Sequence, residues 1–118
     1  MSEAKDMIKL IADPDERMER FFQMLANRKR IRIIKAIGFE EKCVTKINDI
    51  LGMSQPNLSS HLRMLLDAGI LKVRKDRNMR CYSLRYPEWT LSFIREVERF
   101  LEGGEPSAAA PSPGGDPA

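Results

Sequence analysis

The sequence predicts a mainly α fold with one small β hairpin, and two patterns carry this prediction. Apolar residues recur at three- and four-residue spacing through most of the chain, as they do along one face of a helix. Two short segments, 70–75 and 80–85, instead alternate basic and apolar residues around a turn-forming triplet at 76–78. The pattern therefore indicates several amphipathic helices and a single hairpin near the C-terminal end.

The first two helices are predicted from their caps. Asp13 can cap the first helix, with Pro14 at its first position, and Asn27 can cap a second helix that Gly38 ends. The first turn of the second helix carries the cations Arg28 to Arg30, which oppose the helix dipole, so we expect a phosphate partner for them. The apolar stripes are expected to be Met18, Phe21, Phe22 and Leu25 in the first helix, and Ile31, Ile34 and Ile37 in the second.

The next two helices are joined by a very short turn. Thr45 is predicted to cap a third helix that Gly52 ends, and Ser54 begins the fourth after Met53 alone. Gly69 ends the fourth helix. Two helices joined by such a turn form a helix-turn-helix, and the hairpin directly behind it is predicted to be a wing. The inward residues are expected to be Ile47, Ile50 and Leu51, then Leu58, Leu62 and Leu65.

The start of the fourth helix is short-chained and uncharged, which favours contact with base edges. Gln55 and Asn57 carry amides that can approach adenine in a major groove, where long charged side chains would stop at the phosphates. The DNA-contact candidates are Ser54, Gln55, Asn57, Ser59, Ser60, His61 and Arg63 in this helix, Arg74, Lys75, Arg77 and Arg80 in the hairpin, and Arg28 and Lys29 in the second helix.

Charge supports a polyanionic partner. Residues 28–35 carry five basic residues and no acid, and residues 72–85 carry six basic residues against Asp76 alone. Clustered cations gain free energy by displacing counterions from phosphates. The alternative is that both runs form only a solvated face.

The segment 54–71, SQPNLSSHLRMLLDAGIL, resembles the recognition-helix signature of the ArsR/SmtB family of winged helix-turn-helix repressors. Residues 24–37 and 79–84 resemble the same family's second helix and last wing strand, so the resemblance covers roughly residues 20 to 86. The matching positions in the first segment are Ser54, Gln55, Pro56, Ser59, His61, Leu62, Leu65, Gly69, Ile70 and Leu71.

The resemblance implies a homodimer that sits on double-stranded DNA, at an inverted-repeat operator, and leaves it when an effector binds. The family joins its subunits mostly through the first and last helices. Here the last helix is predicted to begin at Pro87 and to end before Gly103-Gly104. The interface candidates are Phe21, Phe22, Phe93, Val97 and Phe100, whose alternative role is ordinary core packing.

The family's metal sites are incomplete in this sequence. One site has the pattern ELCVCDL, and here EKCVTKI (41–47) keeps Cys43 while Thr45 takes the place of the second thiol. Arsenite or cadmium prefers two or more thiolates, so half of the pair is missing. Another family site uses His and acidic residues of the last helix, which has no His here. His61 is expected to contact a phosphate or to pack near the turn.

Cys43 and Cys81 leave a third kind of effector open. Winged helices commonly lay a short strand before the third helix against the last wing strand, which would bring these two cysteines near one another. Lys42 and the following helix start favour a thiolate at Cys43. The pair could therefore be a redox switch, or simply two buried thiols that act as small apolar residues. No cofactor is firmly implied; a thiophilic metal or metalloid at Cys43 and cysteine oxidation are the candidates.

The sequence gives less support to other classes of protein function. With one His and no Gly-rich phosphate loop, the sequence predicts no enzyme. No long apolar stretch or secretory signal is present, so a cytoplasmic protein is expected. A winged-helix module that binds protein or RNA, or a repressor without an inducer, is the alternative function. The 118 residues suit one domain at 1–102, followed by a flexible Gly/Pro/Ala-rich tail at 103–118.

Overall fold

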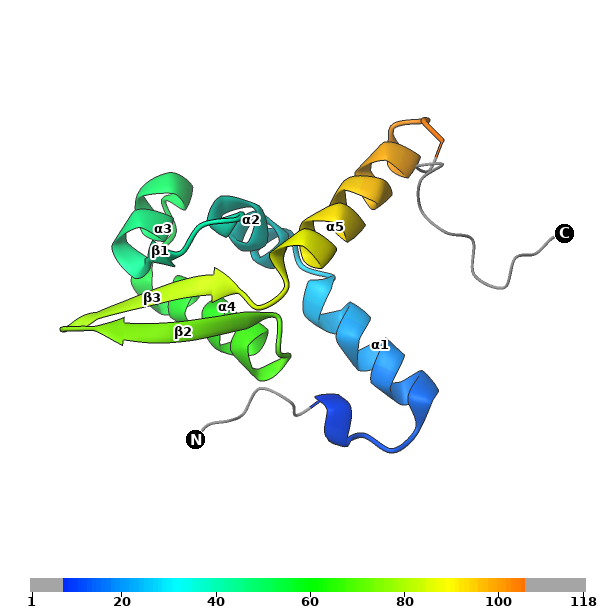
Figure 1. Cartoon of the computed structure of the whole chain (residues 1–118), viewed down its shortest axis with the longest axis horizontal. Coiled ribbons are helices and arrows are strands. Elements are labelled where there is room, and N and C mark those ends of the chain that lie inside the picture. The colour runs from blue at the N-terminus through cyan, green and yellow to red at the C-terminus, as the bar shows by residue number, and fades with distance from the viewer. Residues whose placement is uncertain (1–7, 106–118) are drawn as a thin grey trace, which may run out of the picture.

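The computed structural model describes residues 8–105, and it confirms a mainly α fold with a small sheet (Figure 1). A short 3-10 helix at Ile8–Leu10 comes before the first α-helix. The helices are α1 (Pro14–Leu25), α2 (Arg28–Ile37), α3 (Val44–Leu51), α4 (Gln55–Asp67) and α5 (Pro87–Leu101), and the strands are β1 (Lys42–Cys43), β2 (Leu71–Asp76) and β3 (Met79–Leu84).

The three strands form an antiparallel sheet in the order β1-β3-β2. The hairpin pairs Leu71 with Leu84 at its base and Asp76 with Met79 at its tip, while the two-residue β1 pairs Cys43 with Cys81. Arg77 has a φ of 61° at the tip, because a two-residue hairpin loop requires a positive φ that matches the strand twist. The hairpin extends from one side of the molecule (Figure 1).

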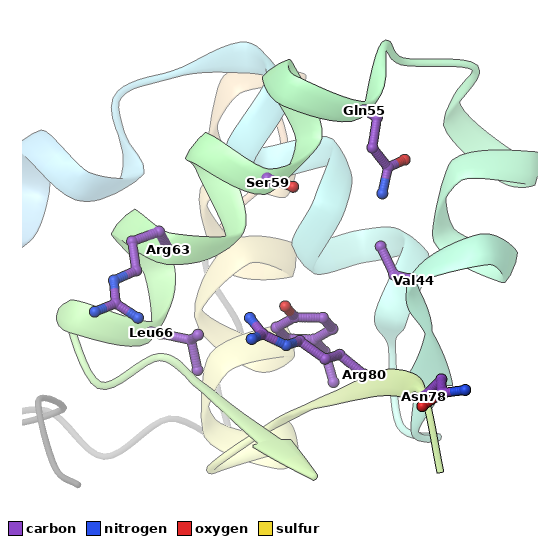
Figure 2. A pocket seen from close by; sticks show the side chains of 8 residues that line it. Val44, Gln55, Ser59, Arg63, Leu66, Asn78 and Arg80 are labelled. Atoms are coloured by element: carbon purple, nitrogen blue, oxygen red, sulfur yellow. The ribbon is translucent and has the colours of Figure 1, made fainter. Parts of the chain in front are cut away.

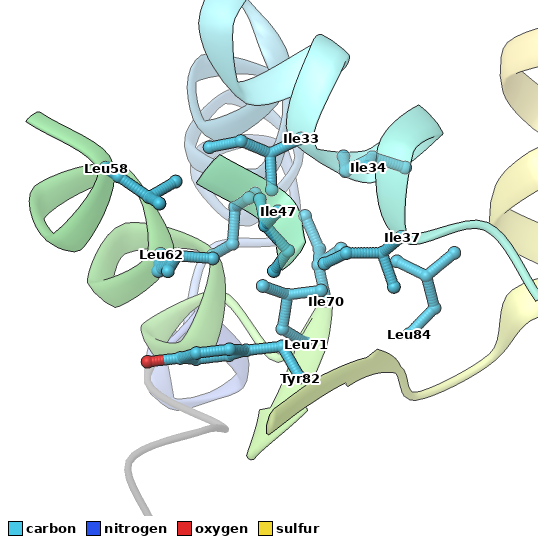
Figure 3. Packing of buried hydrophobic residues seen from close by; sticks show 11 residues of the cluster. Ile33, Ile34, Ile37, Ile47, Leu58, Leu62, Ile70, Leu71, Tyr82 and Leu84 are labelled. Carbon is cyan, nitrogen blue, oxygen red and sulfur yellow. The ribbon is translucent and has the colours of Figure 1, made fainter. Parts of the chain in front are cut away.

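The core lies between α2, α3, α4 and the base of the sheet (Figure 3). The predicted stripe of α4 is confirmed, since Leu58, Leu62 and Leu65 are all buried. The predicted stripe of α2 is shifted: Ile33 is fully buried and Ile31 only half-buried, because Ile33 shares a helix face with Ile37. The buried apolar residues of the core are Ile33, Ile34, Ile37, Ile47, Leu58, Leu62, Leu65, Ile70, Leu71, Tyr82 and Leu84.

Two caps are confirmed and one is wrong. The Asp13 side chain accepts a hydrogen bond from the amide of Asp15, and the Asn27 side chain accepts from the amides of Lys29 and Arg30. Thr45 does not cap α3. Strand β1 runs directly into that helix, so Cys43 occupies the cap position without a side-chain hydrogen bond.

The inward position predicted for Ile50 is also wrong, because its side chain is 49% exposed. Helix α3 has only eight residues and buries Ile47 completely, while Leu51 packs against the core. Gly52 ends the helix in the left-handed conformation, with a φ of 67°. The turn into α4 therefore follows immediately, as the sequence predicts.

Helices α1 and α5 extend from the other side of the body, away from the hairpin (Figure 1). Helix α1 has no fully buried residue, and α5 buries only Thr90. Phe21 of α1 and Trp89 of α5 meet with ring centroids 6.2 Å apart, and Trp89 stacks on Phe93 at 5.8 Å. The exposed large apolar residues of the two helices are Met18, Phe22, Trp89, Val97, Phe100 and Leu101.

Helix α5 ends at Leu101, before Gly103 as predicted, while the domain boundary at residue 102 stays a prediction. Of the predicted tail at 103–118, residues 106–118 lie outside the described residues, so the tail remains a prediction. Within residues 8–105, none of the helices combines the length and apolar character needed to cross a membrane.

Candidate nucleic-acid interface

A groove of about 300 Å³ separates α4 from the hairpin (Figure 2). Gln55, Ser59 and Arg63 recur every four residues and so share the face of α4 that borders it. On the opposite wall, β3 contributes Arg80 and Tyr82, which alternate to the same face of the strand. The groove is lined by Val44, Gln55, Ser59, Arg63, Leu66, Asn78, Arg80 and Tyr82.

The predicted contact residues of α4 therefore lie on different flanks of the helix. Gln55, Ser59 and Arg63 border the groove, whereas His61 faces the α1–α2 side. Asn57 and Ser60 are exposed between these flanks. Ser54, at the cap position, is exposed as well, and its side chain makes no capping hydrogen bond.

The predicted wing residues are all exposed, but they do not share one face. Lys75 is paired with Arg80, so both side chains leave the sheet on the side of the groove. Arg77 stands at the tip. Arg74 lies on the other face and donates two hydrogen bonds to Glu41, from Nε at 3.0 Å and from Nη2 at 2.8 Å. A phosphate at Arg74 would have to compete with this carboxylate.

Glu41 is a partner of Arg74 that the sequence pattern does not indicate. The Arg74 guanidinium lowers the pKa of the Glu41 carboxyl, chiefly through the two hydrogen bonds. No local signal indicates this pairing, because Glu41 and Arg74 are 33 residues apart. Tyr82 was missed too, although its two-residue spacing from Arg80 would have placed it on the same strand face.

The cations at the start of α2 have separate roles. Arg28 and Lys29 are exposed, as a contact with phosphate requires. Arg30 is buried and donates hydrogen bonds to the carbonyls of Met24 at 2.7 Å and Gln23 at 3.2 Å. The expectation of a phosphate partner is wrong for Arg30, because the last turn of α1 leaves carbonyls that need a donor.

His61 is the third partner of Arg30. The Arg30 Nη1 atom lies 3.2 Å from His61 Nδ1. A guanidinium can only donate, so Nδ1 accepts and the neutral ring carries its hydrogen on Nε2. Burial lowers the pKa of His61, and the nearby charges of Arg30 and Lys29 lower it further. The histidine therefore packs beside α1 and α2.

Cys43 and Cys81 are joined by a disulfide between β1 and β3. The two residues are directly opposite in the antiparallel register, so the expected proximity is confirmed. Cys43 is half-buried, Cys81 is 1% exposed, and Thr45 is exposed with its hydroxyl 4.0 Å from Met79 Sδ. Among residues 8–105, no group of three or more His, Cys, Asp or Glu side chains is placed to hold a metal ion.

The sequence family is decided by comparison with known proteins. The family model for the bacterial regulatory proteins of the arsR family matches residues 27–73. The arsenical resistance operon repressor of Escherichia coli is 33% identical over 81 residues, which cover 66% of this chain and 69% of that protein. The chain belongs to the ArsR family.

Other members of the ArsR family match at similar levels. The arsenic resistance transcriptional regulator ArsR1 of Pseudomonas putida is 35% identical over 79 residues, covering 64% of this chain and 62% of that regulator. The chain thus spans about three fifths of the length of this relative. The solution structure of a homodimeric winged helix-turn-helix domain from Mycobacterium bovis superposes with a TM-score of 0.66, 21% identity, and coverage of 79% of this chain and 93% of that one. This likeness establishes the winged helix-turn-helix fold.

Proposed function

We propose that this ArsR-family chain is a homodimeric transcriptional repressor that binds a specific DNA sequence and acts without catalysis. The observation that carries the proposal is the groove between α4 and the wing. On the α4 side of this groove, the neutral Gln55 and Ser59 come first along the helix. The cations Arg63 and Arg80 also line the groove. This distribution suits a helix that reads base edges while flanking cations bind phosphates.

The docking follows from the exposed surface. The N-terminal half of α4 enters the major groove, where Gln55 and Asn57 reach base edges, and Ser54, Ser59 and Ser60 add short donors and acceptors. Arg77 and Lys75 of the wing bind the phosphate backbone. Arg28 and Lys29 bind a phosphate at the amino end of α2, where the helix dipole also favours an anion.

A second copy of the chain is the partner proposed for α1 and α5. Phe22, Val97 and Phe100 are 47%, 41% and 65% exposed, so packing within one chain does not account for them. Phe21 and Phe93 are half-buried beside them. Contiguous exposed apolar residues mark an interaction surface. The homodimeric state of the Mycobacterium bovis domain, which shares the fold, supports a two-fold pairing of this surface.

We also propose that the binding of an effector releases the dimer from DNA. A two-fold dimer presents two copies of α4 to an inverted repeat, and a change in their spacing lowers affinity for both half-sites together. Because a bacterial chromosome lies in the cytoplasm, that is the proposed location.

The proposal is tested by selecting bound duplexes from a random-sequence pool and footprinting the enriched site. We expect an inverted repeat whose half-site centres lie about 34 Å apart, one turn of DNA, or a multiple of this spacing. Sedimentation should show two chains on each site. Parallel pools of single- and double-stranded RNA test the alternative. Enrichment of RNA alone, or of no sequence, would overturn the proposal.

A further inference from the structure

We propose that Cys43 and Cys81 form a reversible dithiol–disulfide switch that sets the position of the wing against α4 and thereby the affinity for DNA. This inference rests on the proposed function, because the affected surface is the groove between α4 and the hairpin. Three observations support it: where the disulfide lies, how few side-chain links besides it join β1 to the wing, and how differently the two cysteine residues are exposed.

The disulfide lies next in sequence to residues of the groove wall, on the face of β3 opposite to the groove. Cys43 ends β1 and occupies the cap position of α3, and the next residue, Val44, lines the groove. Cys81 lies between Arg80 and Tyr82, which both line it as well. A covalent bond between the two cysteines therefore fixes the distance between α3, which supports α4, and the strand that carries the wing.

Core packing of Tyr82 and Ile47 also holds β3 near α3, but few other contacts join β1 to the wing beyond the core. Strand β1 pairs with β3 over only two residues. Side-chain links from the hairpin to this segment are the Thr45 hydroxyl, which donates to Met79 Sδ at 4.0 Å, and the Arg74–Glu41 ion pair, whose side chains are 58% and 36% exposed. Exposed ion pairs contribute little to stability, so they constrain the wing weakly. Reduction of the disulfide therefore leaves the part of the wing beyond the core held at this point by a short ladder, one hydroxyl–sulfur contact and one solvated ion pair.

The two sulfurs suit sequential roles in disulfide exchange. Cys43 is half-buried and precedes the amino end of α3, which favours its thiolate, whereas Cys81 is 1% exposed. The proposed oxidant is a small disulfide, RSSR. The Cys43 thiolate attacks one of its sulfurs and expels RS⁻, which takes up a proton. The Cys81 thiolate then attacks the Cys43 sulfur of the mixed disulfide and expels the second RS⁻.

The net reaction forms one protein disulfide, passes two electrons to the small disulfide, and releases two molecules of RSH. It is reversed by excess RSH. In a reducing compartment, a protein disulfide is usually transient and redox-sensing rather than a permanent support. The proposed cytoplasmic location therefore favours a switch over a structural bond.

The disulfide form is the proposed tight-binding state. With the wing already fixed against α4, binding orders fewer side chains and less backbone, so less free energy is lost on association. Allosteric couplings commonly change affinity by about 5–150-fold. We expect the disulfide form to bind the selected operator at least about fivefold more tightly than the dithiol form.

The test uses the full chain in buffers of reduced and oxidised glutathione. Alkylation followed by mass spectrometry gives the fraction of disulfide, and fluorescence anisotropy with operators selected in both redox states gives the affinity. Cys43→Ala, Cys81→Ala and the double variant should bind like the dithiol wild type and ignore the buffer. Ser83→Ala, two residues along β3 from Cys81, keeps both cysteines and should respond as the wild type does.

The possible outcomes separate the two proposals. Equal affinity for both redox forms, or failure of oxidised glutathione to form the disulfide, would overturn the switch and leave the repressor proposal intact. If neither form binds any selected DNA, the repressor proposal fails and the switch falls with it. Circular dichroism of each form shows whether a lower affinity arises from a displaced wing in a folded chain, as proposed, or from global unfolding, which would also overturn the switch.

Discussion

Arg30 Nη1 lies 3.2 Å from His61 Nδ1, and this contact joins the start of α2 to the middle of α4. The same guanidinium donates to the carbonyls of Gln23 and Met24 at the end of α1. One buried side chain therefore connects the helix proposed for dimerisation with the helix proposed to read DNA. Changes at Arg30 should affect the fold, while changes at its exposed neighbours should affect binding.

Arg30→Met should destabilise the chain by about 3 kcal/mol, since it removes charge-assisted hydrogen bonds and leaves part-buried carbonyls without a donor. Arg28→Met is the matched control on the same turn. Because Arg28 is exposed, this change should stay within about 0.5 kcal/mol of the wild type. Urea unfolding followed by circular dichroism measures both. Equal stability of the two variants would contradict the structural role of Arg30.

His61 should make stability depend on pH. Its pKa is lowered in the folded chain, so the unfolded chain binds the proton more tightly, and stability falls as pH drops below about 6.5, the ordinary value for His. Above that pH, His61 no longer lowers the stability of the folded chain. Thermal melts between pH 5 and 8, in steps of about half a pH unit, measure the slope of stability against pH. His61→Gln should flatten the profile, and an unchanged slope would assign the effect to other groups.

Gln55→Ala should cost about 1–3 kcal/mol in binding to the selected operator and relax preference at one or two base pairs. The reason is that a neutral amide at the groove-facing start of α4 supplies base contacts rather than charge. Binding to a panel of single-base operator variants measures this loss. A uniform loss across the panel would mean that Gln55 positions the helix without reading sequence.

Arg77→Ala should weaken binding to all sequences alike and lower the slope of log affinity against log salt by roughly one unit. Arg77 stands at the tip of the exposed hairpin, where its charge can reach a phosphate. Arg77→Lys, which keeps the charge, should retain the slope. Anisotropy titrations at several salt concentrations measure it, and a change in sequence preference would argue for a base contact instead.

Phe100→Glu should convert the proposed dimer to a monomer while leaving the fold intact, because Phe100 is 65% exposed in the single chain. A buried charge at the interface would lose hydration without gaining a partner. Ser92→Glu, another exposed position on α5, is the control and should remain dimeric. Analytical ultracentrifugation measures the change. A dimeric Phe100→Glu chain would place the interface elsewhere.

The local features of the fold were predictable from the sequence. The caps at Asp13 and Asn27, the stop at Gly52 and the buried stripe of α4 all depend on residues within a few positions of one another. Capping bonds and helical periodicity are local, so neighbouring residues are enough to determine them. The family signature of α4 is local in the same sense, and it led to the correct fold.

Tertiary structure decided the roles of particular side chains. Arg30 meets His61 across 31 residues, Arg74 meets Glu41 across 33, and Cys43 meets Cys81 across 38. These pairings depend on helix packing and strand register, which no local pattern contains. The antiparallel register places Cys43, the last residue of β1, opposite Cys81. Helix α3 begins at the next residue, so Cys43 and not Thr45 occupies the cap position. Local chemistry thus determined the elements, and their packing determined which cations remain exposed and which cysteines are paired.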